Sequence, residues 1–348
     1  MRNFTFKGLF LAVVFIVLGS LSIQAADGLI TKQITIKLDE AGTLPNKIGS
    51  TKKFQITNLK IIGEINGRDL QMIREMAGKD VRGNDTDGML SVLDLSDAKI
   101  VEGGGYNING FYYPTSNDKI GDNAFCDCSG LTSLTLPSDV TEIGNAAFEG
   151  CSGLASLTLP SGVTKIGYSA FLRCSGLTSL TLPSGVTEIG NAAFEGCSGL
   201  TSLTLPSGVT KIGNAAFEGC SGLTSLTLPS GVAKIGDYAF HGCSGLTSIY
   251  VYAEKLPNMG NDVFEGCDAK KCTVYVPKGT YDDYWLSEFG YFENIVEFDP
   301  TGINNVITSN DAKELSRYSV NGQRLSAPTK GLNIVKYSDG SVKKVAVQ

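Results

Sequence analysis

The chain is poor in the residues that most often carry enzyme chemistry, with one histidine, His241, and one tryptophan among its 348 residues. Histidine-dependent hydrolysis would rest on this one side chain, because a serine or cysteine nucleophile needs a nearby base. Tetrahedral zinc sites gather several Cys or His ligands around one point. We therefore expect no enzyme activity, no metal and no cofactor.

Long apolar runs are also scarce, and the clearest one covers residues 9–18. It follows the basic residues Arg2 and Lys7 and precedes Ala25, which is the arrangement of a secretory signal peptide. The run is too short to span a bilayer as a helix, and no cysteine near Ala25 offers a thiol for a lipid anchor. We expect residues 1–25 to be removed on export and expect no transmembrane segment.

The chain lacks an excess of positive charge, since 29 Lys and Arg stand against 35 Asp and Glu, a net charge of −6. Removing residues 1–25 takes away Arg2 and Lys7 and no acidic residue, which leaves 27 against 35 and a net charge of −8. Proteins that bind nucleic acid neutralise phosphates with basic surfaces. This balance disfavours nucleic acid as a partner.

What the chain has in abundance is one repeated unit of twenty-three residues. The unit at residues 131–153 returns almost unchanged at Leu154, Leu177, Leu200 and Leu223, and a degenerate copy begins at Leu246. A single unit of this size cannot bury its own apolar face, so successive units must stack on one another. The period predicts a solenoid, which offers a long repetitive surface in place of one pocket of converging unlike groups.

Each unit begins with a short apolar-polar alternation that predicts a strand, and Pro137 ends that strand in the first full unit. Strands stacked in parallel place equivalent residues of successive units in rows about 4.8 Å apart. We expect these side chains of the first full unit to point inward: Leu131, Leu134, Leu136, Val140, Ile143, Ala147, Phe148 and Cys151.

This unit resembles the BspA-like leucine-rich repeat of Bacteroidetes-type anaerobes and spirochaetes, which carries Leu-x-x-Leu/Ile-x-Leu, then Ile-Gly, then Ala-Phe-x-x-Cys. The matching residues are Leu131, Leu134, Leu136, Ile143, Gly144, Ala147, Phe148 and Cys151. The resemblance implies an α/β-type leucine-rich repeat solenoid with parallel strands on its concave face. It also implies a secreted or surface protein that binds host proteins or other cells, with no shared catalytic residue.

Caps are expected at both ends of the repeats. Residues 26–89 are assigned to an N-terminal cap, with a strand at 33–37 and a helix at 69–77 that Asp69 caps. Residues 90–299 hold the solenoid and its C-terminal cap. There a helix following Thr280 and Asp283 carries aromatic residues that seal the stack: Tyr284, Trp285, Phe289 and Phe292.

Residues 300–348 are expected to form a small β segment. Asn321-Gly322 and Asp339-Gly340 separate alternating runs, which is a hairpin signal. The segment is also similar to the C-terminal sorting domains read by the type IX secretion system, although Gln323 separates Gly322 from Arg324. It is either a sorting signal or an inert β appendage.

The nine cysteines favour packing over cross-linking. Six occupy one repeat position, so their side chains point the same way, which fits disulfide geometry poorly: Cys128, Cys151, Cys174, Cys197, Cys220 and Cys243. Cys126 falls where other units carry Glu149, Glu195 or His241, so we expect it to be exposed. Cys267 and Cys272 either pair across a short loop or stay free.

Two exposed rows run along the predicted stack. One mostly alternates in charge, which favours solubility and register: Lys119, Glu142, Lys165, Glu188, Lys211 and Lys234. The other is the outward strand position, the expected binding row: Asp94, Tyr112, Thr135, Thr158, Thr181, Thr204, Thr227, Tyr250 and Tyr275. Its threonines and tyrosines suit exposed strands in any protein, and tyrosine is also a rigid anchor at binding surfaces.

The sequence therefore favours a non-catalytic protein, exported to the cell surface, the medium or the periplasm, that binds a protein partner on a host or neighbouring cell. Carbohydrate binding through stacked aromatic rings is one alternative. A surface spacer without a ligand, which a uniform threonine face would suit, is the other.

Overall fold

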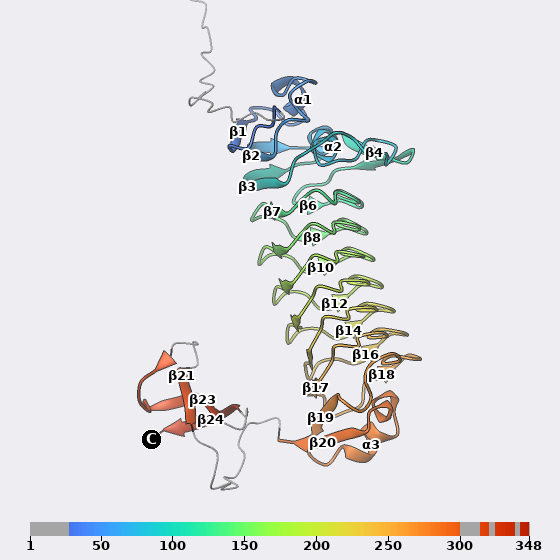
Figure 1. Ribbon diagram of the computed structural model, residues 1–348, viewed down its shortest axis with the longest axis vertical. Helices are drawn as coiled ribbons and strands as arrows, with labels where there is room; N and C mark the ends of the chain where they lie inside the picture. The colour runs from blue at the N-terminus through green and yellow to red at the C-terminus, as the bar shows by residue number, and fades with distance from the viewer. Residues whose placement is uncertain (1–27, 300–313, 320–323, 338–341, 348) are drawn as a thin grey trace, which may run out of the picture.

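The structure is a computed structural model that describes residues 28–299, 314–319, 324–337 and 342–347. Residues 28–299 form an elongated stack of turns with a cap at each end (Figure 1). The predicted signal peptide, residues 1–25, lies outside the described residues. No described helix is long and apolar enough to cross a membrane.

A long parallel sheet of eleven strands runs the length of the stack, in the order β1-β2-β3-β7-β9-β11-β13-β15-β17-β19-β20. The caps contribute β1 (Ile34–Lys37), β2 (Asn58–Ile65) and β20 (Asn294–Phe298). The turns contribute β3 (Val92–Ile100), β7 (Ser133–Thr135), β9 (Ser156–Thr158), β11 (Ser179–Thr181), β13 (Ser202–Thr204), β15 (Ser225–Leu228), β17 (Ser248–Val251) and β19 (Thr273–Pro277). The predicted repeat strands are confirmed, in register from turn to turn.

A second parallel sheet of seven two-residue strands runs beside the first. Its strands are β6 (Lys119–Ile120), β8 (Glu142–Ile143), β10 (Lys165–Ile166), β12 (Glu188–Ile189), β14 (Lys211–Ile212), β16 (Lys234–Ile235) and β18 (Asn258–Met259). Tight turns connect these strands to the next turn of the stack, and the described helices lie in the caps. The fold is thus the predicted leucine-rich repeat solenoid.

The core of the solenoid consists of rows of identical side chains. Phenylalanine rings stack from Phe125 to Phe264 with centroids 5.2 to 5.8 Å apart between neighbouring rings, as for Phe194 and Phe217 at 5.2 Å. The predicted inward residues of the first full unit are all buried. The cysteine thiols add a hydrogen bond between turns, since Cys174 Sγ donates to the carbonyl of Phe148 at 3.0 Å.

All nine cysteines are buried and free. The six-residue row points inward as predicted, and Cys267 extends it by donating to the Phe240 carbonyl at 3.4 Å, so it forms no pair with Cys272. The expectation that Cys126 is exposed is wrong, because its exposed fraction is 9%. The N-terminal cap covers this turn, where Arg74 contacts the Cys126 carbonyl. Burial raises the pKa of the Cys126 thiol to about 12.

The N-terminal cap contains α1 (Leu44–Lys47) and α2 (Gly67–Met76). The predicted helix is confirmed, but it begins two residues early and its cap is Asn66, whose side chain accepts from Arg68 N at 3.0 Å. Asp69 is the reciprocal member of a capping box and accepts from Asn66 N at 2.9 Å. The pattern identified the right helix and assigned its cap to the wrong residue.

A side chain of the N-terminal cap donates to backbone carbonyls of the first repeat turn, which have no preceding turn to accept from. In the interior, carbonyls on the loop side of each turn accept N–H groups from the turn before, as Ala147 O accepts from Phe125 N at 2.7 Å. At the first turn, Arg74 Nη1 takes that role and donates to Ala124 O at 3.3 Å and to Cys126 O at 3.1 Å. A buried arginine here replaces the backbone of a missing turn.

The C-terminal cap holds α3 (Tyr281–Trp285) and the 3-10 helix η1 (Glu288–Tyr291). The predicted single helix is therefore two short ones, and Thr280 makes no side-chain cap to α3. Tyr284, Phe289 and Phe292 are buried against the end of the phenylalanine stack, as predicted. Trp285 is 45% exposed and does not seal the core.

The C-terminal segment forms a separate four-stranded sheet in the order β22-β21-β23-β24. Its strands are β21 (Glu314–Ser319), β22 (Arg324–Leu325), β23 (Gly331–Tyr337) and β24 (Val342–Val347). The antiparallel pairs β21-β22 and β23-β24 agree with the predicted hairpins. The turn residues 320–323 and 338–341 lie outside the described residues.

Candidate functional site

The expected binding row lies on the long sheet, with one exception. Consecutive members pair in register across the sheet from Asp94 and Thr135 at one end to Tyr250 and Tyr275 at the other. The intervening pairs are Thr135 with Thr158, Thr158 with Thr181, Thr181 with Thr204, Thr204 with Thr227, and Thr227 with Tyr250. The strand register thus makes one continuous row, which we call the outward row.

Tyr112 does not belong to the outward row, and its assignment there is wrong. It lies in a hairpin of β4 (Gly105–Ile108) and β5 (Phe111–Pro114), where it pairs with Asn107. Asn109 and Gly110 have φ of 52° and 84°, and such a left-handed pair makes a tight turn that folds the chain back on itself. The hairpin is therefore its own two-stranded sheet at the side of the stack (Figure 1).

The caps extend the outward row by residues that the repeat pattern did not indicate. Lys60 pairs with Asp94 and Thr35 with Lys60 at the N-terminal end, and Val296 pairs with Tyr275 at the C-terminal end. The caps lack the twenty-three-residue period, so counting along the sequence misses these positions. Exposure alternates along 34–37 in the structure, but it does not alternate along 294–298, where Val296 and Glu297 are both exposed.

The N-terminal end of the outward row is charged and held by ion pairs. Lys60 Nζ lies 3.0 Å from Asp94 and 2.7 Å from Asp97. Hydrogen bonds to Asp97 and Asp94 raise the pKa of Lys60. Burial opposes ionisation of Asp94, but hydrogen bonds from Ser96 and Lys60 outweigh it and lower the pKa of that carboxyl. Because the Asp94 carboxylate is already bound to Lys60 and Ser96, it is poorly placed to anchor a ligand.

The C-terminal end of the outward row is aromatic. The rings of Tyr250 and Tyr275 stack with centroids 4.5 Å apart and planes 6° apart. Phe298 packs edge-on against Tyr250 at 6.2 Å and against Tyr252 at 5.3 Å. Tyr252 is 36% exposed, and Val296, which pairs with Tyr275, is 46% exposed. The rings of Tyr250, Tyr275 and Phe298 are half-buried. We call these five residues the aromatic cluster.

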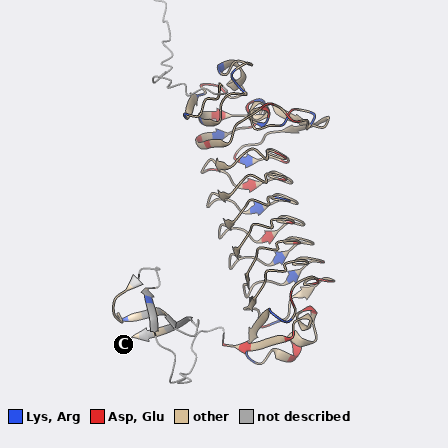
Figure 2. Ribbon diagram, in the orientation of Figure 1, with Lys and Arg blue, Asp and Glu red and all other residues tan. Residues whose placement is uncertain are grey.

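The second sheet carries the predicted charged row, which alternates in sign along most of its length (Figure 2). Glu142 contacts Lys119 at 2.8 Å and also pairs with Lys165, and Glu188 pairs with Lys211. Hydrogen bonds from Lys119 and Lys165 lower the pKa of Glu142. The row ends with two lysines side by side, because Lys234 follows Lys211.

An asparagine row follows the second sheet and ties the turns together. Asp122 Oδ1 accepts from Asn145 N at 2.7 Å, and Asn145 Oδ1 accepts from Tyr168 N at 2.9 Å. Asn191 resumes the pattern with Asn214 N at 2.9 Å. The Tyr168 side chain, 60% exposed, has no carbonyl to offer the next turn, so the row is interrupted there.

His241 lies on the outer surface, as expected from its repeat position. Its Nδ1 is 3.5 Å from a Glu218 carboxylate oxygen, and its ring meets Tyr238 edge-on at 5.9 Å. Across the described parts of the chain, no group of three or more His, Cys, Asp or Glu side chains is arranged to hold a metal ion.

The comparisons with known proteins agree on the repeat. The model of the BspA type leucine rich repeat region matches in six copies, over residues 104–223, 165–287 and 216–306. A leucine rich repeat protein of T. pallidum is 37% identical, with 44% of this chain and 71% of that one covered and a TM-score of 0.42. A leucine rich cell surface protein of Faecalibacterium prausnitzii is 35% identical, covering 46% and 47%, with a TM-score of 0.35. No curated protein matches the chain.

Proposed function

Since this chain belongs to the BspA-type leucine-rich repeat family, we propose that it is a non-catalytic protein that binds a protein partner on the exposed face of its long sheet. A stack of similar turns supplies an extended surface, and repeat proteins use such surfaces to bind partners. The structural neighbours include a protein named as a cell surface protein. This supports the proposal that residues 1–25 direct export and that the solenoid is displayed at the cell surface.

The observation that carries the proposal is the aromatic cluster at the C-terminal end of the outward row. Tyrosine is enriched at the energetic centre of protein interfaces because it buries a large area at low conformational cost. The 4.5 Å stack of Tyr250 on Tyr275 fixes both rings before a partner arrives, so little side-chain entropy is lost on binding. Exposed Val296 extends the same surface.

The remaining outward row suits the edge of an interface. Its threonines are small, repeated and uniformly oriented, so they offer the same contacts at several turns and cannot fix the position of a partner by themselves. The aromatic cluster breaks that uniformity at one end. We therefore place the anchoring contacts at Tyr250 and Tyr275 and expect the threonine stretch between Thr135 and Thr227 to contribute shape complementarity.

An array of purified secreted and cell-surface proteins, probed beside a glycan array, tests this function. We expect protein hits whose affinity falls by more than about 1 kcal/mol, roughly fivefold, in Tyr250→Ala or Tyr275→Ala. Glu188→Lys on the second sheet is the matched control and should change affinity less at physiological salt. Glycan hits without protein hits would favour carbohydrate binding, and no hit on either array would favour a spacer.

Surface display is tested separately by brief protease treatment of intact producing cells. Cleavage of the solenoid while a cytoplasmic marker survives supports display. Protection of the solenoid until the outer envelope is opened would place the protein in the periplasm.

A further inference from the structure

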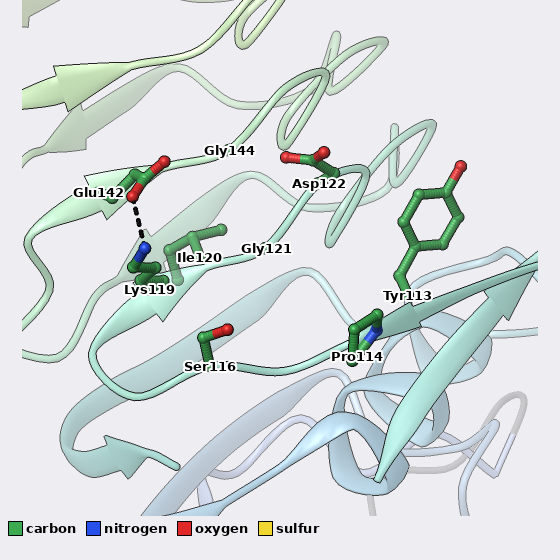
Figure 3. A pocket seen from close by; sticks show the side chains of 9 residues that line it. All are labelled: Tyr113, Pro114, Ser116, Lys119, Ile120, Gly121, Asp122, Glu142 and Gly144. Carbon is green, nitrogen blue, oxygen red and sulfur yellow. Dashed lines mark ion pairs between the residues drawn. The ribbon is translucent and has the colours of Figure 1, made fainter. Parts of the chain in front are cut away.

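A small cavity lies where the β4-β5 hairpin meets the first strands of the second sheet (Figure 3). Its volume is about 250 Å³, below the roughly 300 to 1,000 Å³ of pockets that hold drug-sized ligands. The cavity is therefore the size of a single ring with its substituents. Nine residues line it, among them Tyr113, Pro114, Ser116, Lys119, Asp122 and Glu142.

The hairpin makes this cavity distinct from the rest of the repetitive surface. Later turns reproduce only part of the floor, since Asn145 follows Asp122 at the equivalent position, whereas Lys165 follows Glu142. The wall of Tyr113 and Pro114 belongs to the hairpin, which interrupts the first turn between β3 and β6. At the N-terminal end the hairpin thus adds a wall to a part of the second sheet whose components recur along the stack.

The wall is apolar and preorganised. The Tyr113 ring stacks on the buried Tyr106 ring with centroids 5.7 Å apart and planes 17° apart. Tyr106 is fixed in turn by the hydrogen bond from its hydroxyl to the Asp122 carbonyl at 2.6 Å. An aromatic ring held at one edge of a polar cavity presents an apolar contact to the C–H groups of a ligand ring.

The charged groups of the cavity neutralise one another. Lys119 Nζ lies 2.8 Å from Glu142, which also holds Lys165 from the next turn. The Asp122 carboxylate accepts from the backbone and the side-chain amide of Asn145 at 2.7 and 3.2 Å. Lys165 lies outside the lining but pairs with Glu142, so that with it the two lining carboxylates, Asp122 and Glu142, are balanced by two ammonium groups. The remaining lone pairs of the two carboxylates, with the Ser116 hydroxyl, can still bind hydroxyl groups.

We propose that this cavity binds one neutral sugar ring, as the terminal residue of a glycan. The ring would place its C–H face against Tyr113 and its hydroxyls toward Ser116, Asp122 and Glu142. Paired charges that keep free lone pairs suit a polyhydroxylated neutral ligand, whereas a cationic or anionic ligand would have to break the ion pairs of Glu142. The site is separate from the aromatic cluster and does not depend on the protein-binding function.

Saturation-transfer difference NMR on the purified full chain tests the site. The probes are neutral hexoses and N-acetylhexosamines, with glucosamine as a cationic and glucuronic acid as an anionic comparison. We expect saturation of ring protons in at least one neutral sugar, with a dissociation constant in the millimolar range, about 4 kcal/mol of binding free energy. Absence of any signal, or signals from the charged sugars alone, would overturn the proposal.

Variants then locate the binding. Ser116→Trp places bulk at the exposed rim of the cavity without touching the core, and Tyr113→Ala removes the apolar wall. Both should weaken binding at least tenfold, provided that circular dichroism shows each variant folded. Tyr168→Ala removes an exposed tyrosine two turns along the same side and should leave binding unchanged. Equal binding by wild type and Ser116→Trp would place the sugar elsewhere and refute the site.

Discussion

Replacing Arg74 by methionine should destabilise the N-terminal end of the solenoid strongly. The guanidinium is 1% exposed, and its Nη1 donates to the carbonyls of Asn123, Ala124 and Cys126 at 2.9, 3.3 and 3.1 Å. Methionine retains most of the apolar stem and offers no donor, so the Ala124 and Cys126 carbonyls lose the partner that the structure gives them, while the Asn123 carbonyl still accepts from Cys126 N at 3.1 Å.

The size of the effect follows from two opposing contributions. A buried polar group left without a partner costs about 1 to 3 kcal/mol, and the two carbonyls of Ala124 and Cys126 are left in that state. Removing a buried charge returns part of its desolvation cost, and the structure shows no carboxylate partner for Arg74 among the described residues. We expect a net loss of about 3 kcal/mol, a large fraction of the ~5 to 15 kcal/mol that stabilises a typical domain.

Urea unfolding and amide hydrogen exchange measure this loss, and exchange also locates it. Because each turn contacts only its neighbours, faster exchange should concentrate in residues 58–150 and fade toward the C-terminal turns. Arg68→Met is the matched control, since Arg68 lies on the same helix α2 and is exposed. If the free energies of unfolding of Arg74→Met and Arg68→Met differ by less than about 0.5 kcal/mol, the capping role assigned to Arg74 is wrong.

The remaining predictions concern single rows of the stack. Cys126 should react with a thiol reagent as slowly as the inward cysteines, because only the thiolate reacts and burial raises the pKa of this thiol to about 12; rapid labelling of one thiol in the native protein would contradict its burial. Burial and the neighbouring Glu218 raise the pKa of Glu195, so above that pKa the ionised carboxylate lowers the free energy of unfolding. Glu195→Gln should therefore stabilise the protein at pH 7 by a few tenths of a kcal/mol. Ion pairs lower the pKa of Glu142, so its contribution to stability is present above the ordinary glutamate pKa and is lost in acid. Glu142→Gln should therefore destabilise the protein at pH 7 and make less difference near pH 3. Melting curves at pH 7 must show a raised melting temperature for Glu195→Gln and a lowered one for Glu142→Gln. Tyr168→Asn should restore the interrupted asparagine row and raise stability by roughly 0.5 kcal/mol, and a lower melting temperature would count against the role of that row.

The repeat period was enough to predict the strands, the inward side chains and the register of the outward row. Identical spacing places residues such as Thr181 and Thr204 side by side whatever the curvature of the stack. The cysteine row was predictable for the same reason. A sequence period predicts contacts between neighbouring units, and in a solenoid most contacts are of this kind.

The errors fall where the period is broken. Tyr112 is predicted in the outward row as an outward strand position, but Asn109-Gly110 beside it is a hairpin signal that indicates a separate sheet. Cys126 was judged by its repeat position, which cannot show that a cap covers the first turn. Lys60 and Val296 belong to caps whose sequence carries no period, so only the three-dimensional pairing places them in the row.

The repeat pattern predicts Tyr250 and Tyr275 in the outward row, but it does not predict the contact of Phe298 with Tyr250 or the hairpin cavity. Phe298 joins Tyr250 because β20 adds in parallel beside β19, a pairing that follows from the cap fold and not from the repeat. Tyr113 closes the cavity because its hairpin returns to the second sheet. Both features arise where an irregular segment meets a regular one, which is where a repeat protein departs from uniformity.

Site-specific photo-crosslinking to a protein identified on the array tests the central claim most directly. A photoreactive phenylalanine analogue replaces Tyr275 in one preparation and the exposed Lys165 of the second sheet in another. If the aromatic cluster anchors the partner, illumination should give a covalent adduct from position 275 and little or none from position 165. An adduct from position 165 with none from position 275 would contradict binding on the long sheet.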